Sequence, residues 1–185
     1  MAWGMGKSHY IMKPFVLGRF KLNDRILILT ENNSLNKDVY NDLLKLLNDE
    51  GEDSELVLWS HMDRQPITED HKIFICSMES LFKLTRRKPT PIEFNTIILD
   101  ETETIISHLE SETLGEKYDS GEVLTDMREV IINSNKVMCL DADLSISRFN
   151  LLTQSCNIEN GLIDLYENTN NKWRTHKINI NACGS

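Results

Sequence analysis

Short, unbroken runs of apolar residues alternate with helix-like patterns along most of this 185-residue chain. Such runs occur at 25–30, 56–59, 72–76, 96–99 and 136–140. Apolar runs of this length that lack polar alternation are typical of strands buried on both faces. Strands that alternate with helices favour a mostly parallel sheet with helices on both sides. The sequence therefore predicts an α/β fold with three layers.

Helical periodicity fills the intervals between these runs. Helices are expected at 7–18, 34–49, 78–84, 102–111, 121–133 and 145–153, and one or two further strands are expected between 161 and 180. The length and the 40% apolar content suit one ordinary domain over residues 1–185.

Charge and composition exclude several classes of protein. The formal net charge of −9 argues against general attraction to nucleic acid, although it permits a local groove. The dense basic run Arg86-Arg87-Lys88 is interpreted as a solvated loop. No apolar run reaches the 18 residues of a membrane-spanning helix. The four scattered cysteines predict a reducing compartment, the cytoplasm or the nucleus.

A glycine-containing segment, Gly4-Met5-Gly6-Lys7-Ser8, precedes the first helical pattern. Glycines let backbone N–H groups converge on a phosphate, and a helix N-terminus favours negative charge. In a phosphate loop Lys7 would bind the β- and γ-phosphates of ATP and Ser8 would ligate Mg²⁺, with His9 completing the nucleotide-binding segment. Met1 stands where the full loop pattern has a glycine, so a chance match remains the alternative.

Two carboxylates, Asp100 and Glu101, directly follow the apolar run at 96–99. At the carboxyl end of a parallel strand, Asp100 would hold Mg²⁺ and Glu101 would activate the attacking water as a general base. The simpler interpretation is an acidic first turn of a helix.

A third apolar run ends in Asp141-Ala142-Asp143. A small residue between two acids suits a tight turn beside the γ-phosphate, where hydrolysis could be sensed. The alternative is an ordinary strand-to-helix loop in which Asp143 or Ser145 caps the helix.

The order of these segments resembles that of a superfamily-2 helicase, and more narrowly the helicase part of the herpesvirus-type replication origin-binding proteins of large DNA viruses. The resemblance spans roughly residues 1–150 and is carried by GMGKS (4–8), RILILT (25–30), CSMESL (76–81), LDETETII (99–106) and MCLDADLS (138–145). Where arginines are common in that family, this chain reads Glu31-Asn32-Asn33.

This resemblance implies a RecA-like P-loop domain with a mostly parallel central sheet, whose first strand is expected to be missing. It implies ATP and Mg²⁺ as cofactors, and a single-stranded DNA track and a second RecA-like domain as partners. Asp141 and Asp143 would couple the nucleotide state to the track, and Ser34 and Ser80 would contact phosphodiesters. It also implies a role in DNA replication, in the host cell of a large DNA virus.

These patterns support three hypotheses about function. The first is the ATP-dependent DNA helicase motor of a replication initiator. The second is a different P-loop NTPase, and the third is a truncated nucleotide-binding module without turnover. Because such motors hydrolyse ATP between two RecA-like domains, and the second domain supplies arginine fingers, these 185 residues alone are expected to be inactive.

Overall fold

A computed structural model describes residues 11–53, 57–59, 68, 70–85, 92–109, 120–141, 145–155, 162–169 and 172–179. Its elements along the chain are α1 (Lys13–Lys21), β1 (Ile26–Thr30), α2 (Asn33–Asp49), β2 (Val57–Trp59), β3 (Ile73–Ser77), η3 (Met78–Ser80), α3 (Phe82–Thr85), β4 (Thr96–Asp100), α4 (Thr102–Leu109), α6 (Ser120–Ile132), β5 (Lys136–Leu140), α7 (Ile146–Ser155), β6 (Leu162–Thr169) and β7 (Lys172–Asn179).

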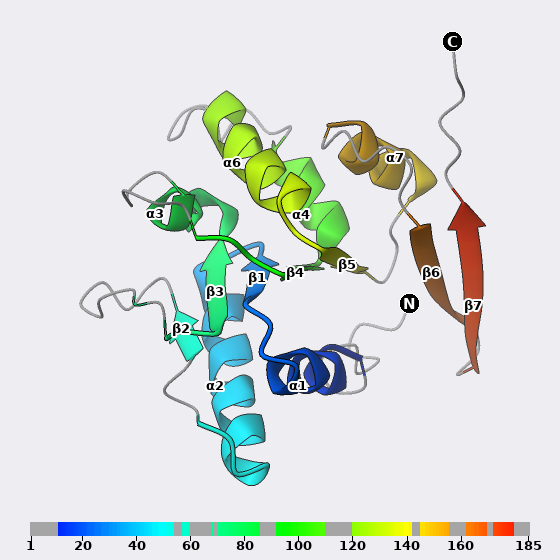
Figure 1. Ribbon diagram of the computed structural model, residues 1–185. Coiled ribbons are helices and arrows are strands. Elements are labelled where there is room, and N and C mark those ends of the chain that lie inside the picture. Colours follow the sequence, from blue (N-terminus) through cyan, green and yellow to red (C-terminus); the bar gives the residue numbers. More distant parts are fainter. Residues whose placement is uncertain are drawn as a thin grey trace.

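Five strands form one parallel sheet in the order β2-β3-β1-β4-β5. Helices lie on both faces, with α1 and α2 below the sheet and α3, α4 and α6 above it in Figure 1. The predicted three-layer, mostly parallel α/β fold is therefore confirmed. The strands β6 and β7 pair antiparallel in a separate two-stranded sheet, in the segment where one or two strands were expected.

Alternate residues of the buried strands feed two separate cores. Ile26, Ile28, Ile73, Ile75 and Ile98 pack with residues of α1 and α2, whereas Leu27, Leu29, Phe74, Ile97 and Leu99 pack with residues of α3, α4 and α6. Every residue of β1, β3 and β4 is buried. The absence of polar alternation in these runs follows from this burial on both faces.

The chain changes direction at β1. It runs from β1 to the edge strand β2, returns to β3 beside β1, and then crosses to β4 on the other side of β1. In open parallel sheets, ligands bind at the carboxyl ends of the strands near such a switch. The carboxyl ends of β1 and β4 are therefore the part of the fold in which a site is expected.

Element boundaries differ most from the predictions in two places. The helix expected at 7–18 is described as α1 from Lys13 to Lys21, and its expected start lies outside the described residues. The helix expected at 78–84 is divided into η3 and α3. Leu81 N–H donates to Met78 O at 3.0 Å and Leu84 N–H donates to Leu81 O at 2.8 Å, the three-residue spacing of a 3₁₀ turn.

Hydrogen bonds also connect the elements at the amino ends of β1 and β4, the end of the sheet opposite the carboxyl rim. Asp24 accepts hydrogen bonds from the Arg19 guanidinium and from Thr96 Oγ1, the latter at 2.9 Å. Asn95 Oδ1 accepts a hydrogen bond from Arg25 N–H at 2.8 Å. These contacts join α1, β1 and β4 at the end of the sheet remote from the paired acids.

Candidate nucleotide site and the turns around it

The carboxyl ends of four strands bring polar residues to one rim of the sheet. Thr30 is level with Ser77 in the pairing of β1 with β3, and Asp100 is level with Leu140 in the pairing of β4 with β5. Asp141 follows Leu140 directly. The acids predicted to serve the nucleotide at the ends of β4 and β5 therefore share this rim with the segments after β1 and β3. Those two segments contain Ser34 and Ser80.

Asp100 is the last residue of β4 and is 3% exposed. Its oxygens are hard donors of the kind that Mg²⁺ prefers. Its position and chemistry fit the predicted magnesium ligand, which stays a prediction, and its burial differs from the solvated acid of the simpler interpretation.

Glu101 adopts a left-handed backbone conformation, with φ of 63°. Its N–H donates to Leu140 O at 2.9 Å, and its carbonyl accepts from Ile105 N–H at 3.0 Å in α4. A non-glycine residue in this conformation costs about 1–3 kcal/mol and persists only when its surroundings enforce it. Because Glu101 leaves the extended conformation, the regular alternation of side chains across the sheet ends at Asp100.

Asp141 and Glu103 form reciprocal contacts between two turns, termed here the α4–α7 link. Asp141 Oδ2 accepts a hydrogen bond from Glu103 N–H, in the first turn of α4, at 2.6 Å. Glu103 Oε2 accepts from Ser145 N–H at 3.2 Å and from Ser145 Oγ at 3.4 Å, just before α7. Asp141 thus accepts from a donor in the first turn of α4, and Glu103 accepts from donors just before α7. Both are favourable positions for negative charge.

The contact that Glu103 makes with Ser145 was not predicted from the sequence. The local signal of Glu103 is that of an acid in the first turn of a helix, which predicts only a helix-dipole contact. Its partner Ser145 lies 42 residues further along the chain, so local spacing contains no information about the contact.

The two serines predicted to contact phosphodiesters lie in different environments. Ser34 is exposed at the start of α2, where Asn32 Oδ1 accepts hydrogen bonds from Ser34 N–H at 3.1 Å and Leu35 N–H at 3.0 Å. Ser80 is 9% exposed, and its Oγ accepts a hydrogen bond from Ser77 Oγ at 3.3 Å. Contact between Ser80 and a phosphodiester stays a prediction.

Asparagines occupy the segment where arginine is common in the resembled family. Asn36 is fully buried, and its Oδ1 accepts a hydrogen bond from Thr30 Oγ1 at 2.7 Å. Together with the Asn32 cap, this contact fastens the end of β1 to the first turn of α2. Asn32 and Asn36 therefore support the rim with neutral amide groups.

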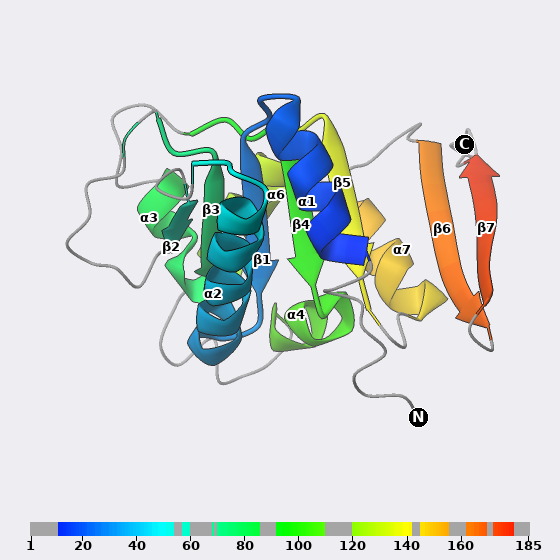
Figure 2. The same cartoon turned by 90° about the horizontal axis from the view of Figure 1, so that it is seen from below.

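The segment Gly4, Met5, Gly6, Lys7, Ser8 and His9 lies outside the described residues, as does Asp143. The roles predicted for these residues remain predictions. The structure does describe the helix that follows the loop: α1 runs antiparallel to the strands, with its first turn toward the rim at which β4 ends (Figure 2).

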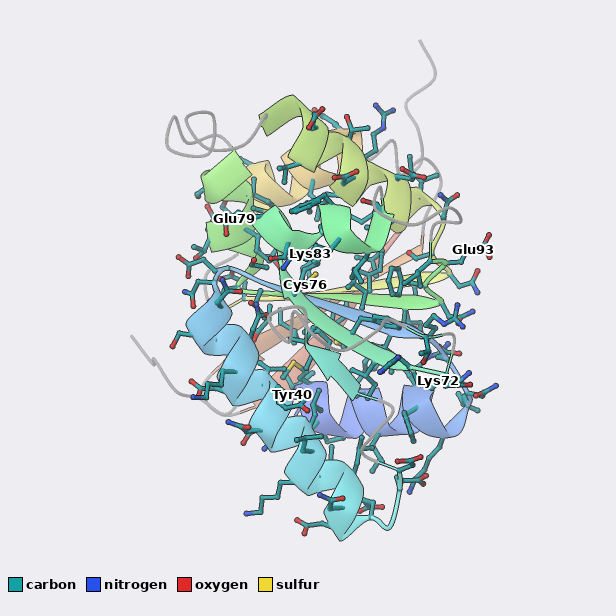
Figure 3. All side chains as sticks on the ribbon, turned by 90° about the vertical axis from the view of Figure 1, so that its left-hand side faces the viewer. Tyr40, Lys72, Cys76, Glu79, Lys83 and Glu93 are labelled. Carbon is teal, nitrogen blue, oxygen red and sulfur yellow. The ribbon has the colours of Figure 1, made fainter. Side chains whose placement is uncertain are left out.

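Cys76, in β3, is fully buried, and desolvation raises the pKa of its thiol to about 12 despite the opposing effect of the Lys83 ammonium. Figure 3 shows Lys83 beside Cys76 on the α3 side of the sheet, with Tyr40 on the α2 side. A thiol with a raised pKa is a poor nucleophile and a poor metal ligand. Neither Cys76 nor half-buried Cys139 is in a disulfide.

The described part of the chain contains no group of three or more His, Cys, Asp and Glu side chains that could hold a metal ion by themselves. No described helix has the length and hydropathy needed to span a membrane.

Comparison with known proteins identifies the class of motor. Residues 1–140 match the family model described as "Type III restriction enzyme, res subunit". The chain belongs to this ResIII family, and it is a motor domain of the superfamily-2 helicase type with an ATP-binding RecA-like fold.

A protein of a large DNA virus is similar over most of the chain. The "Uncharacterized putative helicase R8" of Acanthamoeba polyphaga mimivirus is 30% identical over 151 residues, which cover 78% of this chain. The same match covers 13% of the mimiviral protein, so the chain spans a small part of that relative's length.

Proposed function

We propose that this chain is the ATP-binding motor domain of a DNA helicase that acts in replication, and that it couples ATP hydrolysis to movement along a DNA strand. The observation that carries the proposal is the end of β4, where buried Asp100 and left-handed Glu101 stand at the carboxyl rim of a parallel sheet. Membership of a helicase family supports the same conclusion.

In this proposal the phosphate loop lies directly before α1, so its bound phosphates meet the rim that carries Asp100. Lys7 binds the β- and γ-phosphates, while Ser8 and Asp100 hold the Mg²⁺ ion. When bound, Mg²⁺ neutralises charge on the phosphates during transfer. Glu101 accepts a proton from the attacking water.

The α4–α7 link supplies the coupling part of the proposal. Asp141 contacts the helix that follows Glu101, and Glu103 contacts the helix that follows Asp143. A displacement at one turn is therefore passed to the other through two hydrogen-bonded carboxylates. Ser34 and Ser80 are proposed to contact the DNA strand at the neighbouring ends of β1 and β3.

Nucleotide binding tests the proposed phosphate loop. A fluorescent ATP analogue is titrated with Mg²⁺ into the wild-type chain, into Lys7→Ala, and into Lys45→Ala as a charge-matched control on the exposed face of α2. Lys7→Ala is expected to weaken binding at least tenfold, whereas Lys45→Ala retains wild-type affinity. Equal affinity of all three proteins would refute the phosphate-loop assignment.

Hydrolysis by the complete natural polypeptide that contains this chain tests the catalytic acids. Glu101→Gln is expected to lower kcat by about 10²- to 10⁴-fold, the usual contribution of a general base, while exposed Glu93→Gln serves as the control. A Glu101→Gln protein as fast as its parent would remove the general-base role.

A P-loop NTPase that does not move along DNA is the second candidate, and the net charge of −9 favours it. Stimulation of hydrolysis by single-stranded DNA separates the two. A motor is stimulated, and the stimulation weakens as salt rises. A rate indifferent to DNA at every salt concentration would favour the second candidate.

A further inference from the structure

The turn after β4 holds Glu101 in a conformation that the sequence around it does not favour. Neither Asp100 nor Thr102 is a glycine or asparagine, and Glu101 itself has φ of 63°. A left-handed glutamate is strained, so neighbouring groups must hold it there.

Thr102 provides such a group from inside the protein. Its side chain is fully buried, and its Oγ1 lies 3.1 Å from Leu99 O and 3.4 Å from Leu140 O. Leu140 O also accepts the N–H of Glu101 at 2.9 Å. Leu140 O therefore receives both the N–H of the left-handed residue and the hydroxyl of the residue that follows it.

This arrangement bridges two strands beneath Glu101. Leu99 belongs to β4 and Leu140 ends β5, so the single O–H proton of Thr102 is shared between carbonyls of both neighbouring strands, with the shorter distance to Leu99 O. A valine at this position has nearly the same shape but no donor. Comparison of threonine with valine therefore separates the effect of the hydroxyl from that of side-chain volume.

We propose that Thr102 is a positioning residue that holds Glu101 in its left-handed conformation and thereby sets the place of its carboxylate. This inference rests on the proposed general-base role of Glu101 for its catalytic consequence. Thr102 acts through Glu101 and does not itself contact the nucleotide.

The backbone conformation of Glu101 can be measured in the chain itself by NMR. A left-handed residue gives an intense intraresidue NOE between the amide proton and Hα. This NOE is expected to weaken in Thr102→Val and Thr102→Ala and to persist in Thr102→Ser. Thr85→Val is the control, because buried Thr85 also bonds a backbone carbonyl, Leu81 O at 3.3 Å, but does so in α3.

Hydrolysis by the complete polypeptide then tests the catalytic consequence. Thr102→Val is expected to lower kcat by about 10- to 100-fold with little change in KM, because small misplacements of a catalytic group cost up to about 10²-fold. Thr102→Ser restores most of the rate, and Thr85→Val leaves kcat unchanged. In a Glu101→Gln background, Thr102→Val is expected to cause no further loss.

The outcomes separate the two ideas. A Thr102→Val protein that keeps both the intense NOE and the parental kcat overturns this inference while leaving the role of Glu101 intact. A fast Glu101→Gln protein removes the proposed general base, and the NOE of Thr102→Val then still decides whether Thr102 holds the turn. A further kcat loss from Thr102→Val in the Glu101→Gln background would contradict action through Glu101.

Discussion

Replacing Asp141 by alanine removes one half of the α4–α7 link and leaves the other half in place. Asp141 Oδ2 accepts from the backbone N–H of Glu103 at 2.6 Å, whereas the Glu103 side chain bonds Ser145. Asp141→Ala therefore loosens the start of α4, and Glu103→Ala loosens the start of α7 without removing the N–H that Asp141 binds. The two contacts can be tested separately.

The expected cost of Asp141→Ala follows from its geometry. Loss of a capping side chain costs about 0.5–2 kcal/mol, and a hydrogen bond to a charged group about 1.5–3 kcal/mol. Asp141 is half-buried, so water partly replaces it at the Glu103 N–H. We expect a loss of about 1 kcal/mol, which lowers the Tm by roughly 2–4 °C for a chain of this size. The longer Ser145 contacts predict a smaller loss for Glu103→Ala, of about 0.5 kcal/mol.

Urea denaturation at pH 7 measures these losses, with two controls. Asp141→Asn retains an acceptor for the Glu103 N–H and is expected to retain most of the stability. Asp38→Ala removes an exposed acid on α2 and is expected to change stability by less than about 0.5 kcal/mol. An Asp141→Ala protein as stable as the wild type, or an Asp141→Asn protein as unstable as Asp141→Ala, would refute the capping argument.

Two further predictions concern the core. Burial raises the pKa of the Cys76 thiol to about 12 from an ordinary value of 9.0. Because the thiol of the unfolded chain ionises first, the wild type should lose stability between pH 9 and 12. Urea denaturation across this range should show a steeper decline in the free energy of unfolding for the wild type than for Cys76→Ala, and parallel declines would contradict the burial effect. Ile98→Ala leaves a cavity at a fully buried position in β4 and should lower the free energy of unfolding by about 2–5 kcal/mol. In the same assay Leu22→Ala, at a residue 68% exposed, should lower it by less than about 0.5 kcal/mol. Equal losses would contradict the assigned core.

The central sheet could be predicted because burial on both faces leaves a direct trace in the sequence. The runs at 25–30, 72–76, 96–99 and 136–140 became β1, β3, β4 and β5 within one residue at each end. Helix α2 was predicted from its apolar spacing and begins one residue earlier, because Asn32 caps it. These features depend on local patterns, which is why they were accessible.

The finer features of the candidate site depend on contacts that no local pattern encodes. Glu101 and its neighbours lack the glycine or asparagine that usually indicates a left-handed residue, so its conformation was not predicted. The Thr102 hydroxyl reaches Leu140, 38 residues away, and Glu103 reaches Ser145, 42 residues away. The sequence placed the acids at strand ends, but only the folded chain shows which carbonyls and helix ends they meet.

A crystal structure of this chain with Mn²⁺ and a non-hydrolysable ATP analogue would test the shared site most directly, because the anomalous signal of manganese locates the metal ion independently of the rest of the structure. We expect a single manganese peak between Ser8 and Asp100, with the Lys7 ammonium on the terminal phosphates and Glu101 facing the γ-phosphate. A nucleotide bound away from this rim, or a metal ion remote from Asp100, would contradict the account.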